Sequence, residues 1–162
     1  MINNKCALFT SNNNVKSTHT VNTLKSIIND KAFNATIVGG RYDGDENDWE
    51  RRSWGRGPLT EGSLTHALIF ISLKPQTENG KTYDLSDSDI PVSIHFTNLF
   101  PADDGDEFEY LVKVNQGELT LTHDFSSFLV TGTFSFSVNI EQPDGTELEF
   151  FVKQGELSVG PS

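Results

Sequence analysis

The strict alternation of apolar and polar side chains in the second half of the chain is the feature that most constrains its fold. Val130, Phe134, Phe136 and Val138 share one parity, and threonine and serine fill most of the positions between them. Residues 147–153 alternate in the same way. Because successive side chains of a β-strand point to opposite faces, this period of two predicts half-buried strands. Such strands must pair into a sheet that covers a core.

Turn residues divide this half of the chain into short segments. We expect a hairpin in which residues 107–114 pair with 118–122 around Asn115-Gln116-Gly117. A further turn is expected at 143–145, and a second tight turn at 154–155 leads to a strand at 157–159. The segments VKVNQGELTL and FVKQGELSV echo each other, which we interpret as one hairpin type used twice.

The first half is also rich in predicted strands. Residues 67–73 carry apolar side chains on both faces, which predicts a central strand covered on each side. Another strand is expected over 91–96, with proline at its first position. Residues 24–28 and 32–38 fit a hairpin, although Val21, Leu24, Ile27 and Ile28 also have helical spacing that Thr20 could cap. The β-branched residues at 36–38 favour the hairpin.

These segments predict an all-β protein with about nine or ten strands in one domain. The architecture is either an antiparallel β-sandwich or a closed barrel, with residues 24–162 forming the domain and residues 1–23 an N-terminal segment that could add an edge strand. Twelve phenylalanines against one methionine indicate a core built on phenylalanine rings.

The charge of the chain restricts its partners. The formal net charge is −11, and an acidic surface repels phosphate backbones, which argues against nucleic-acid binding. An acidic surface instead suits a basic protein partner or a divalent cation. The single cysteine excludes an intrachain disulfide and a cysteine-based zinc site.

The targeting signals in the sequence are few. No run of apolar residues is long enough for a membrane-spanning helix, so no membrane span is expected. The chain begins MINNKC without the apolar segment of a signal peptide, which favours a cytoplasmic protein unless a leader was removed.

The order of four short motifs resembles a group of uncharacterised all-β bacterial domains that are often found on exported lipoproteins. The motifs are INDKAFNAT at 28–36, GKTYDL at 80–85, TGTFSF at 131–136 and GELSV at 155–159. The resemblance spans about residues 24–159 and implies an all-β fold of unknown function, with no catalytic residues to transfer. Asp30 stands where the group has glycine, and Cys6 lacks the apolar stretch of a lipobox.

The segment YDGDENDWERRSWGRG at 42–57 is the main candidate for a site. Asp43, Asp45 and Asn47 fit positions one, three and five of a calcium loop, but Asp48 replaces the required glycine and Trp54 the required glutamate. The metal hypothesis is therefore an irregular Ca²⁺ site at Asp43, Asp45, Asn47 and Asp48, joined by the acidic residues 103–107. The alternative is two solvated acidic turns.

Residues 39–63 are expected to form a long loop that carries aromatic and basic side chains. The predicted ligand-binding residues are Tyr42, Trp49, Arg51, Arg52, Trp54 and Arg56. In the alternative, the aromatic rings fold back to close an end of the sandwich or barrel.

The sequence lacks the motifs of common catalytic and phosphate-binding sites, and its four histidines are scattered. The leading hypothesis is a non-enzymatic binding or accessory module that recognises a basic protein through its acidic surface and the 39–63 loop. One alternative is a small-ligand carrier with a barrel cavity. Another is a hydrolase whose distant acids and histidines, such as His66 or His95, converge in the fold.

Overall fold

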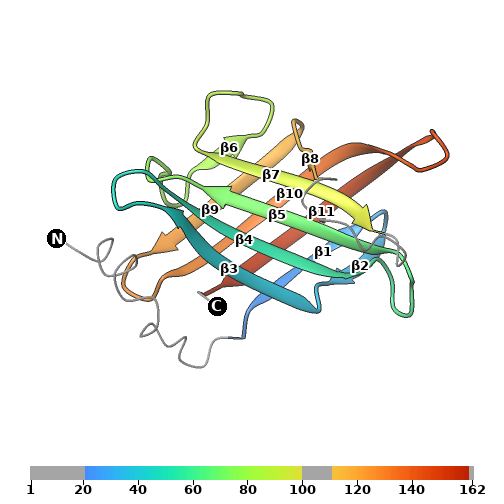
Figure 1. Ribbon diagram of the computed structural model, residues 1–162, viewed down its shortest axis with the longest axis horizontal. Helices are drawn as coiled ribbons and strands as arrows, with labels where there is room; N and C mark the ends of the chain where they lie inside the picture. Colours follow the sequence, from blue (N-terminus) through green and yellow to red (C-terminus); the bar gives the residue numbers. More distant parts are fainter. Residues whose placement is uncertain (1–20, 100–110, 161–162) are drawn as a thin grey trace.

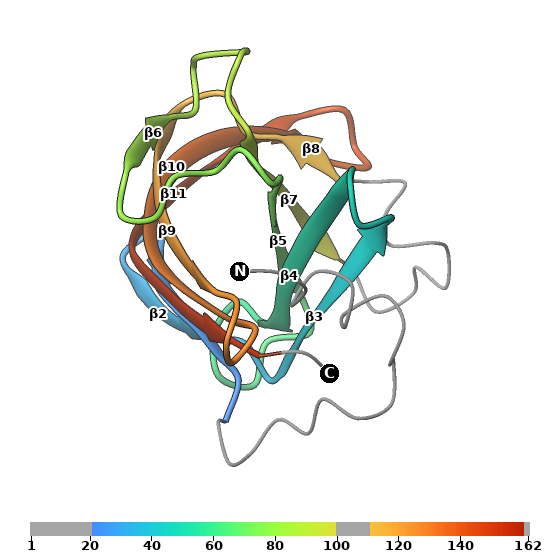
Figure 2. The same cartoon turned by 90° about the vertical axis from the view of Figure 1, so that its left-hand side faces the viewer.

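Two antiparallel β-sheets face each other across a single core in the computed structural model, which describes residues 21–99 and 111–160 (Figure 1). Figure 2 looks along the space between the sheets, with β9, β10 and β11 on one side and β3, β4, β5 and β7 on the other. Within these two ranges every regular element is a strand. The predicted all-β sandwich is confirmed, and the described strands do not close into a barrel.

The two sheets differ in size. The larger has six strands in the order β2 (Lys31–Asn34), β1 (Thr23–Ile28), β11 (Glu147–Val159), β10 (Leu129–Glu141), β9 (Gly117–Asp124) and β6 (Thr82–Asp84). The smaller has five in the order β3 (Ile37–Gly44), β4 (Trp49–Pro58), β5 (His66–Leu73), β7 (Val92–Leu99) and β8 (Val112–Lys113).

The predicted N-terminal hairpin forms from β1 and β2, and the helical alternative is wrong for the described residues. Asn29 and Asp30 both have positive φ, 48° and 67°, as a two-residue hairpin turn requires. The Asn29 side chain also ties this turn to β11, because its Nδ2 donates to the Glu149 carbonyl at 3.2 Å and its Oδ1 accepts from the Phe151 N–H at 2.8 Å. Of the predicted N-terminal segment, residues 1–20 lie outside the described ranges.

The second arm of that hairpin is shorter than predicted. β2 ends at Asn34, and the chain then crosses to the other sheet, where β3 begins at Ile37. The prediction of one continuous arm over 32–38 is therefore wrong.

The predicted hairpin around residues 115–117 is wrong as well. β8 pairs with β7 in the five-stranded sheet, whereas β9 pairs with β10 and β6 in the six-stranded sheet. The turn residues mark a change of direction, but they do not decide whether the next strand joins the same sheet. Residues 107–110 of the predicted arm lie outside the described ranges.

The expected tight turn at residues 154–155 is a β-bulge inside one long strand. Opposite β11, Phe136 pairs with Val152 but Phe134 pairs with Gly155, so β11 carries one extra residue. Gln154 takes up the extra residue with a positive φ of 51°. The bulge changes the parity of the buried side chains, which are Phe150 and Val152 before it and Leu157 and Val159 after it.

The core contains phenylalanine rings from both sheets, packed among leucine, isoleucine and valine side chains. The Phe96 ring from the smaller sheet lies 4.9 Å from the Phe150 ring and 5.8 Å from the Phe136 ring of the larger sheet, centroid to centroid. The predicted covering of residues 67–73 is also found, because Leu68 and Phe70 on the outer face are buried along with the inner face. The interior is therefore filled by side chains of both sheets.

Two glycines of β4 lie in close contact with β1 and with the crossing from β2 to β3. A Cβ on Gly55 would lie 2.9 Å from the Cβ atoms of both Leu24 and Ala35. A Cβ on Gly57 would lie 2.9 Å from the Asn34 carbonyl oxygen. Trp49 lies on the same inner face at the other end of β4 and is buried.

We predict that Gly55→Ala lowers the free energy of unfolding by about 1–3 kcal/mol, because the added methyl group overfills this contact. Urea denaturation followed by circular dichroism measures the change. The double variant Gly55→Ala/Ala35→Gly removes one of the two clashing Cβ atoms, so it should recover part of the loss. Full stability of the single variant would show that the sheets are not in contact there.

Candidate functional site

Residues 39–58 belong to a β-hairpin rather than to the predicted long loop, and only residues 59–63 lie in a connection, which leads to β5. β3 and β4 are paired from Ile37 opposite Arg56 to Gly44 opposite Trp49. The turn between them is closed by Asp45, whose Oδ1 accepts hydrogen bonds from the N–H groups of Asn47 and Asp48, both at 2.9 Å. The loop prediction is wrong because the charged residues of β4 alternate with residues that face the core.

This alternation divides the predicted ligand-binding residues between two faces of the sheet. Trp49 and Arg51 point inward from β4, where Tyr42 of β3 joins them. The other three predicted residues, Arg52, Trp54 and Arg56, lie on the outer face. The six residues therefore do not form one site.

The inward residues build a polar and aromatic cluster that links the two sheets. Arg51 is 0 % exposed, its Nη2 donates to the Val159 carbonyl at 2.9 Å, and its guanidinium lies 4.9 Å from the centre of the Tyr42 ring. The Tyr42 hydroxyl is hydrogen-bonded to His123 Nε2 from β9. Trp49 meets both the Tyr42 and the His123 rings edge-on, at 5.7 and 5.5 Å. These rings fill one end of the interior, as the alternative interpretation of the aromatic residues expected.

Burial dominates the protonation of this cluster. It lowers the pKa of His123 to about 4, with a further lowering by the Arg51 charge and an opposing effect of Asp124. Burial likewise raises the pKa of Tyr42 and lowers that of Arg51. His123 is therefore neutral at pH 7. Its backbone is held by Asn79, whose Oδ1 accepts from the His123 N–H at 2.8 Å.

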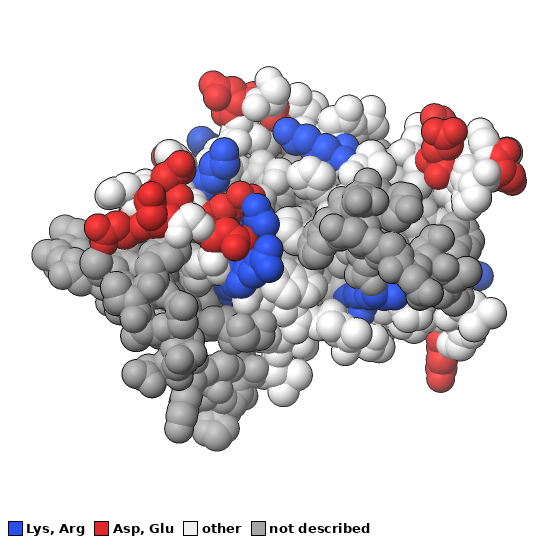
Figure 3. Space-filling view, in the orientation of Figure 1, with Lys and Arg blue, Asp and Glu red and all other residues white. Residues whose placement is uncertain are grey.

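The outward residues are engaged with their neighbours. Arg52 pairs with Asp43 at 3.1 Å and with Glu50 at 3.5 Å, and its guanidinium lies 5.9 Å from the Phe70 ring. Trp54 stacks on the same ring at 6.4 Å with an interplanar angle of 12°. Figure 3 shows acidic and basic atoms intermixed over this part of the molecule. The outer face of β4 thus carries a network of compensated charges.

The predicted calcium ligands also have other contacts. Asp43 accepts from Arg41 at 3.0 Å and from Arg52, and Asp45 closes the hairpin turn. Within residues 21–99 and 111–160 no group of three or more His, Cys, Asp or Glu side chains is arranged to hold a metal ion. The second acidic segment, 103–107, lies outside these ranges. The Ca²⁺ site remains a prediction.

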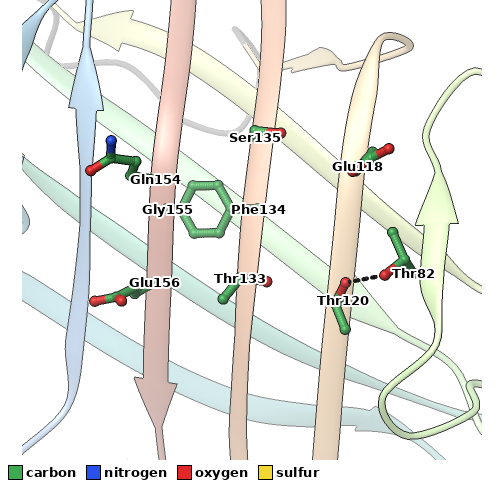
Figure 4. A pocket seen from close by; sticks show the side chains of 9 residues that line it. All are labelled: Thr82, Glu118, Thr120, Thr133, Phe134, Ser135, Gln154, Gly155 and Glu156. Carbon is green, nitrogen blue, oxygen red and sulfur yellow. Dashed lines mark hydrogen bonds between the residues drawn. The ribbon is translucent and has the colours of Figure 1, made fainter.

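A groove of about 550 Å³ lies on the outer face of the six-stranded sheet (Figure 4). It is lined by Thr82, Glu118, Thr120, Thr133, Phe134, Ser135, Gln154, Gly155 and Glu156. The buried residues Phe134 and Gly155 contribute the floor, and the other side chains project to the outside from four strands. The lining is therefore rich in hydroxyl and carboxylate groups.

The side chains on one side of this groove form a single row across the whole sheet. Register pairs join Thr82, Thr120, Thr133, Glu156, Lys25 and Asn34, one residue from each strand. Thr82 and Thr120 are hydrogen-bonded through their hydroxyls at 2.7 Å, and Lys25 pairs with Glu156 at 3.3 Å. The row continues into a second hollow of about 350 Å³ that shares Gln154 and Glu156 with the first.

The two carboxylates of the groove come from the echoing sequence segments. Gln116-Gly117-Glu118-Leu119 and Gln154-Gly155-Glu156-Leu157 flank β10, one on each side. In both segments the leucine is buried and the glutamate is exposed. These glutamates were not among the predicted site residues, although the repeated Gln-Gly-Glu-Leu segment is a sequence signal that could have identified them.

Comparisons with models of known protein families, with curated proteins and with solved structures found no match. Among the described residues no helix is long and apolar enough to cross a membrane. The groove is therefore the feature that a functional proposal can be based on.

We predict that acid destabilises the protein through His123. Its folded pKa of about 4 is below the ordinary value of 6.5, so the unfolded chain binds this proton first as the pH falls. The contribution of neutral His123 is complete above pH 6.5 and is lost between pH 6.5 and about 4, up to about 3 kcal/mol. Urea denaturation at several pH values measures this slope.

The control is His123→Gln, which keeps a polar side chain but does not titrate. Wild type and variant should share the acid sensitivity of the exposed aspartates and differ only in the slope over this window. Equal slopes would mean that His123 is not buried as described.

Proposed function

We propose that the chain is a non-enzymatic binding module and that its groove takes a cationic segment of a basic protein partner. The observation that supports this most is the position of Glu118 and Glu156 on opposite sides of β10, above the hydroxyls of Thr133 and Ser135. A cationic side chain over β10 lies between the two carboxylates and beside hydroxyl groups that can accept its hydrogen bonds.

The charge of the chain and a contact within it favour a cationic ligand. The net charge of −11 attracts a basic partner over a distance and speeds association. Lys25 already places an ammonium group on Glu156 at 3.3 Å, which shows the kind of contact that a ligand would make. Glu118 has no ion-pair partner among the described residues, so it is available to a cation from another molecule.

The two alternative functions gain less support from the structure. The described strands form a ring-filled sandwich, whereas a carrier of the predicted kind needs a barrel cavity. The two histidines considered for a hydrolase lie on neighbouring strands, but His66 is opposite Leu99 and His95 is opposite Phe70, four residues or about 13 Å apart along the strands.

We predict that a fluorescently labelled octalysine peptide binds the protein and that Glu118→Gln and Glu156→Gln each weaken binding by about three- to tenfold. Fluorescence anisotropy at about 50 mM and about 300 mM NaCl measures the affinity, which should fall as salt screens the charges. Lys25→Gln should strengthen binding, since it releases Glu156 from its internal partner.

Glu147→Gln is the matched control, because it removes the same charge from β11 at a residue outside the groove lining. It should change the affinity by less than about twofold. An equal loss in all three glutamate variants would point to net charge alone. Binding of a neutral oligosaccharide in place of the peptide would overturn the proposal.

A further inference from the structure

The two hollows share Gln154 and Glu156 and together form one continuous groove. They differ in chemistry, and the distance between them constrains which ligand can occupy both. Resting on the proposed function, we propose that the bound segment crosses the strands in a polyproline II conformation. It places a cationic side chain over β10 and an apolar side chain three residues away over β1.

The groove runs across the strands rather than along them. Its first wall is the row from Thr82 to Asn34, one residue from each of the six strands. Its second wall is the parallel row that includes Glu118, Ser135, Gln154, Ile27 and Ala32. The floor between them is formed by buried residues, namely Phe134, Ser26 and Phe33, whose side chains point inward, and Gly155, which has no side chain.

The width and length of this groove suit one extended chain. The walls are two residues apart along each strand, about 6.8 Å, and the six strands span about 24 Å at their usual spacing. A ligand in this direction lies at a right angle to the strands, so it cannot join the sheet as a further strand. Recognition of the ligand then depends on its side chains, and the two hollows suit different kinds of side chain.

The hollow over β10 is acidic, whereas the hollow over β1 is partly apolar and lined by a cation. In the first, Glu118 and Glu156 lie on either side of two hydroxyl residues. In the second, Ile27 and Ala32 lie next to Lys25 and Asn34. Lys25 disfavours a second cation there, and the methyl groups of Ile27 and Ala32 favour an apolar side chain.

The distance between the hollows selects the backbone conformation. β10 and β1 are separated by β11 alone, so these two strands lie two strand spacings apart, about 9.6 Å. Polyproline II has three residues per turn and rises about 3.1 Å per residue, so side chains at positions i and i+3 share a face about 9.3 Å apart. A β-conformation ligand places its same-face side chains about 6.6 or 13.2 Å apart and fits neither.

Labelled peptides that differ only in the spacing between lysine and leucine test this inference. The probes are Pro-Pro-Lys-Pro-Pro-Leu-Pro-Pro, its two relatives with leucine one position nearer or farther, and a fourth with serine in place of leucine. Anisotropy should give the i+3 peptide an affinity about tenfold higher than the other three. Equal binding by all four peptides would overturn the inference while leaving the proposed function intact. Failure of every lysine peptide to bind would overturn both.

Variants of the second hollow test the same point from the side of the protein. Ile27→Ser should remove the advantage of leucine over serine at i+3 while leaving the contribution of lysine. Ala32→Glu on the exposed edge strand should weaken the leucine peptide and strengthen one with lysine at both positions. Glu118→Gln should weaken the four original peptides by the same factor. Unchanged leucine preference in folded Ile27→Ser and Ala32→Glu proteins would contradict the assignment of the hollow over β1.

Discussion

The contact between the two sheets along the inner face of β4 is the interaction on which the rest of the structure depends. From its end to its beginning, this face presents Gly57, Gly55, Ser53, Arg51 and Trp49, a graded series from no side chain to the largest. Residues of β1 and of the crossing from β2 to β3 pack directly against the two glycines, and the Trp49 ring is buried at the other end of the strand. Since protein interiors are filled at nearly constant density, the size of each inward side chain of β4 matches the space at its position.

A charged residue of β4 lies in the core because its polar atoms reach a backbone acceptor of the other sheet. Arg51 spans the gap to the end of β11, where the Val159 carbonyl accepts its hydrogen bond. Tyr42 and His123 complete the bridge from the two sheets. This cluster is structural in character, and the groove on the opposite side of the six-stranded sheet uses none of its residues. Stability and the proposed recognition are therefore assigned to different surfaces of the sheets.

The sequence predicts the local structure better than the connections. Alternation identified β10 and most of β11, because burial of one face leaves a direct trace in the side-chain pattern, and apolar residues on both faces identified β5. It could not show that β8 and β9 belong to different sheets, since pairing depends on long-range contacts that turn residues do not encode. At Gln154 the pattern changes phase, and a turn and a bulge leave the same trace in the sequence.

The candidate site was not predicted for a related reason. Glu118 and Glu156 are two of 23 acids, and only the register of both neighbours of β10 places them together.

The bulge in β11 determines which face of the sheet each later residue of the strand occupies. Before Gln154 the even-numbered residues face the core, and after it the odd-numbered residues do. A regular zigzag through all of these residues would turn Leu157 and Val159 into solvent and Glu156 toward the core. The step of three residues on β11 against two on β10 prevents this. The single extra residue is therefore what keeps Glu156 outside, beside the groove, while Leu157 stays inside.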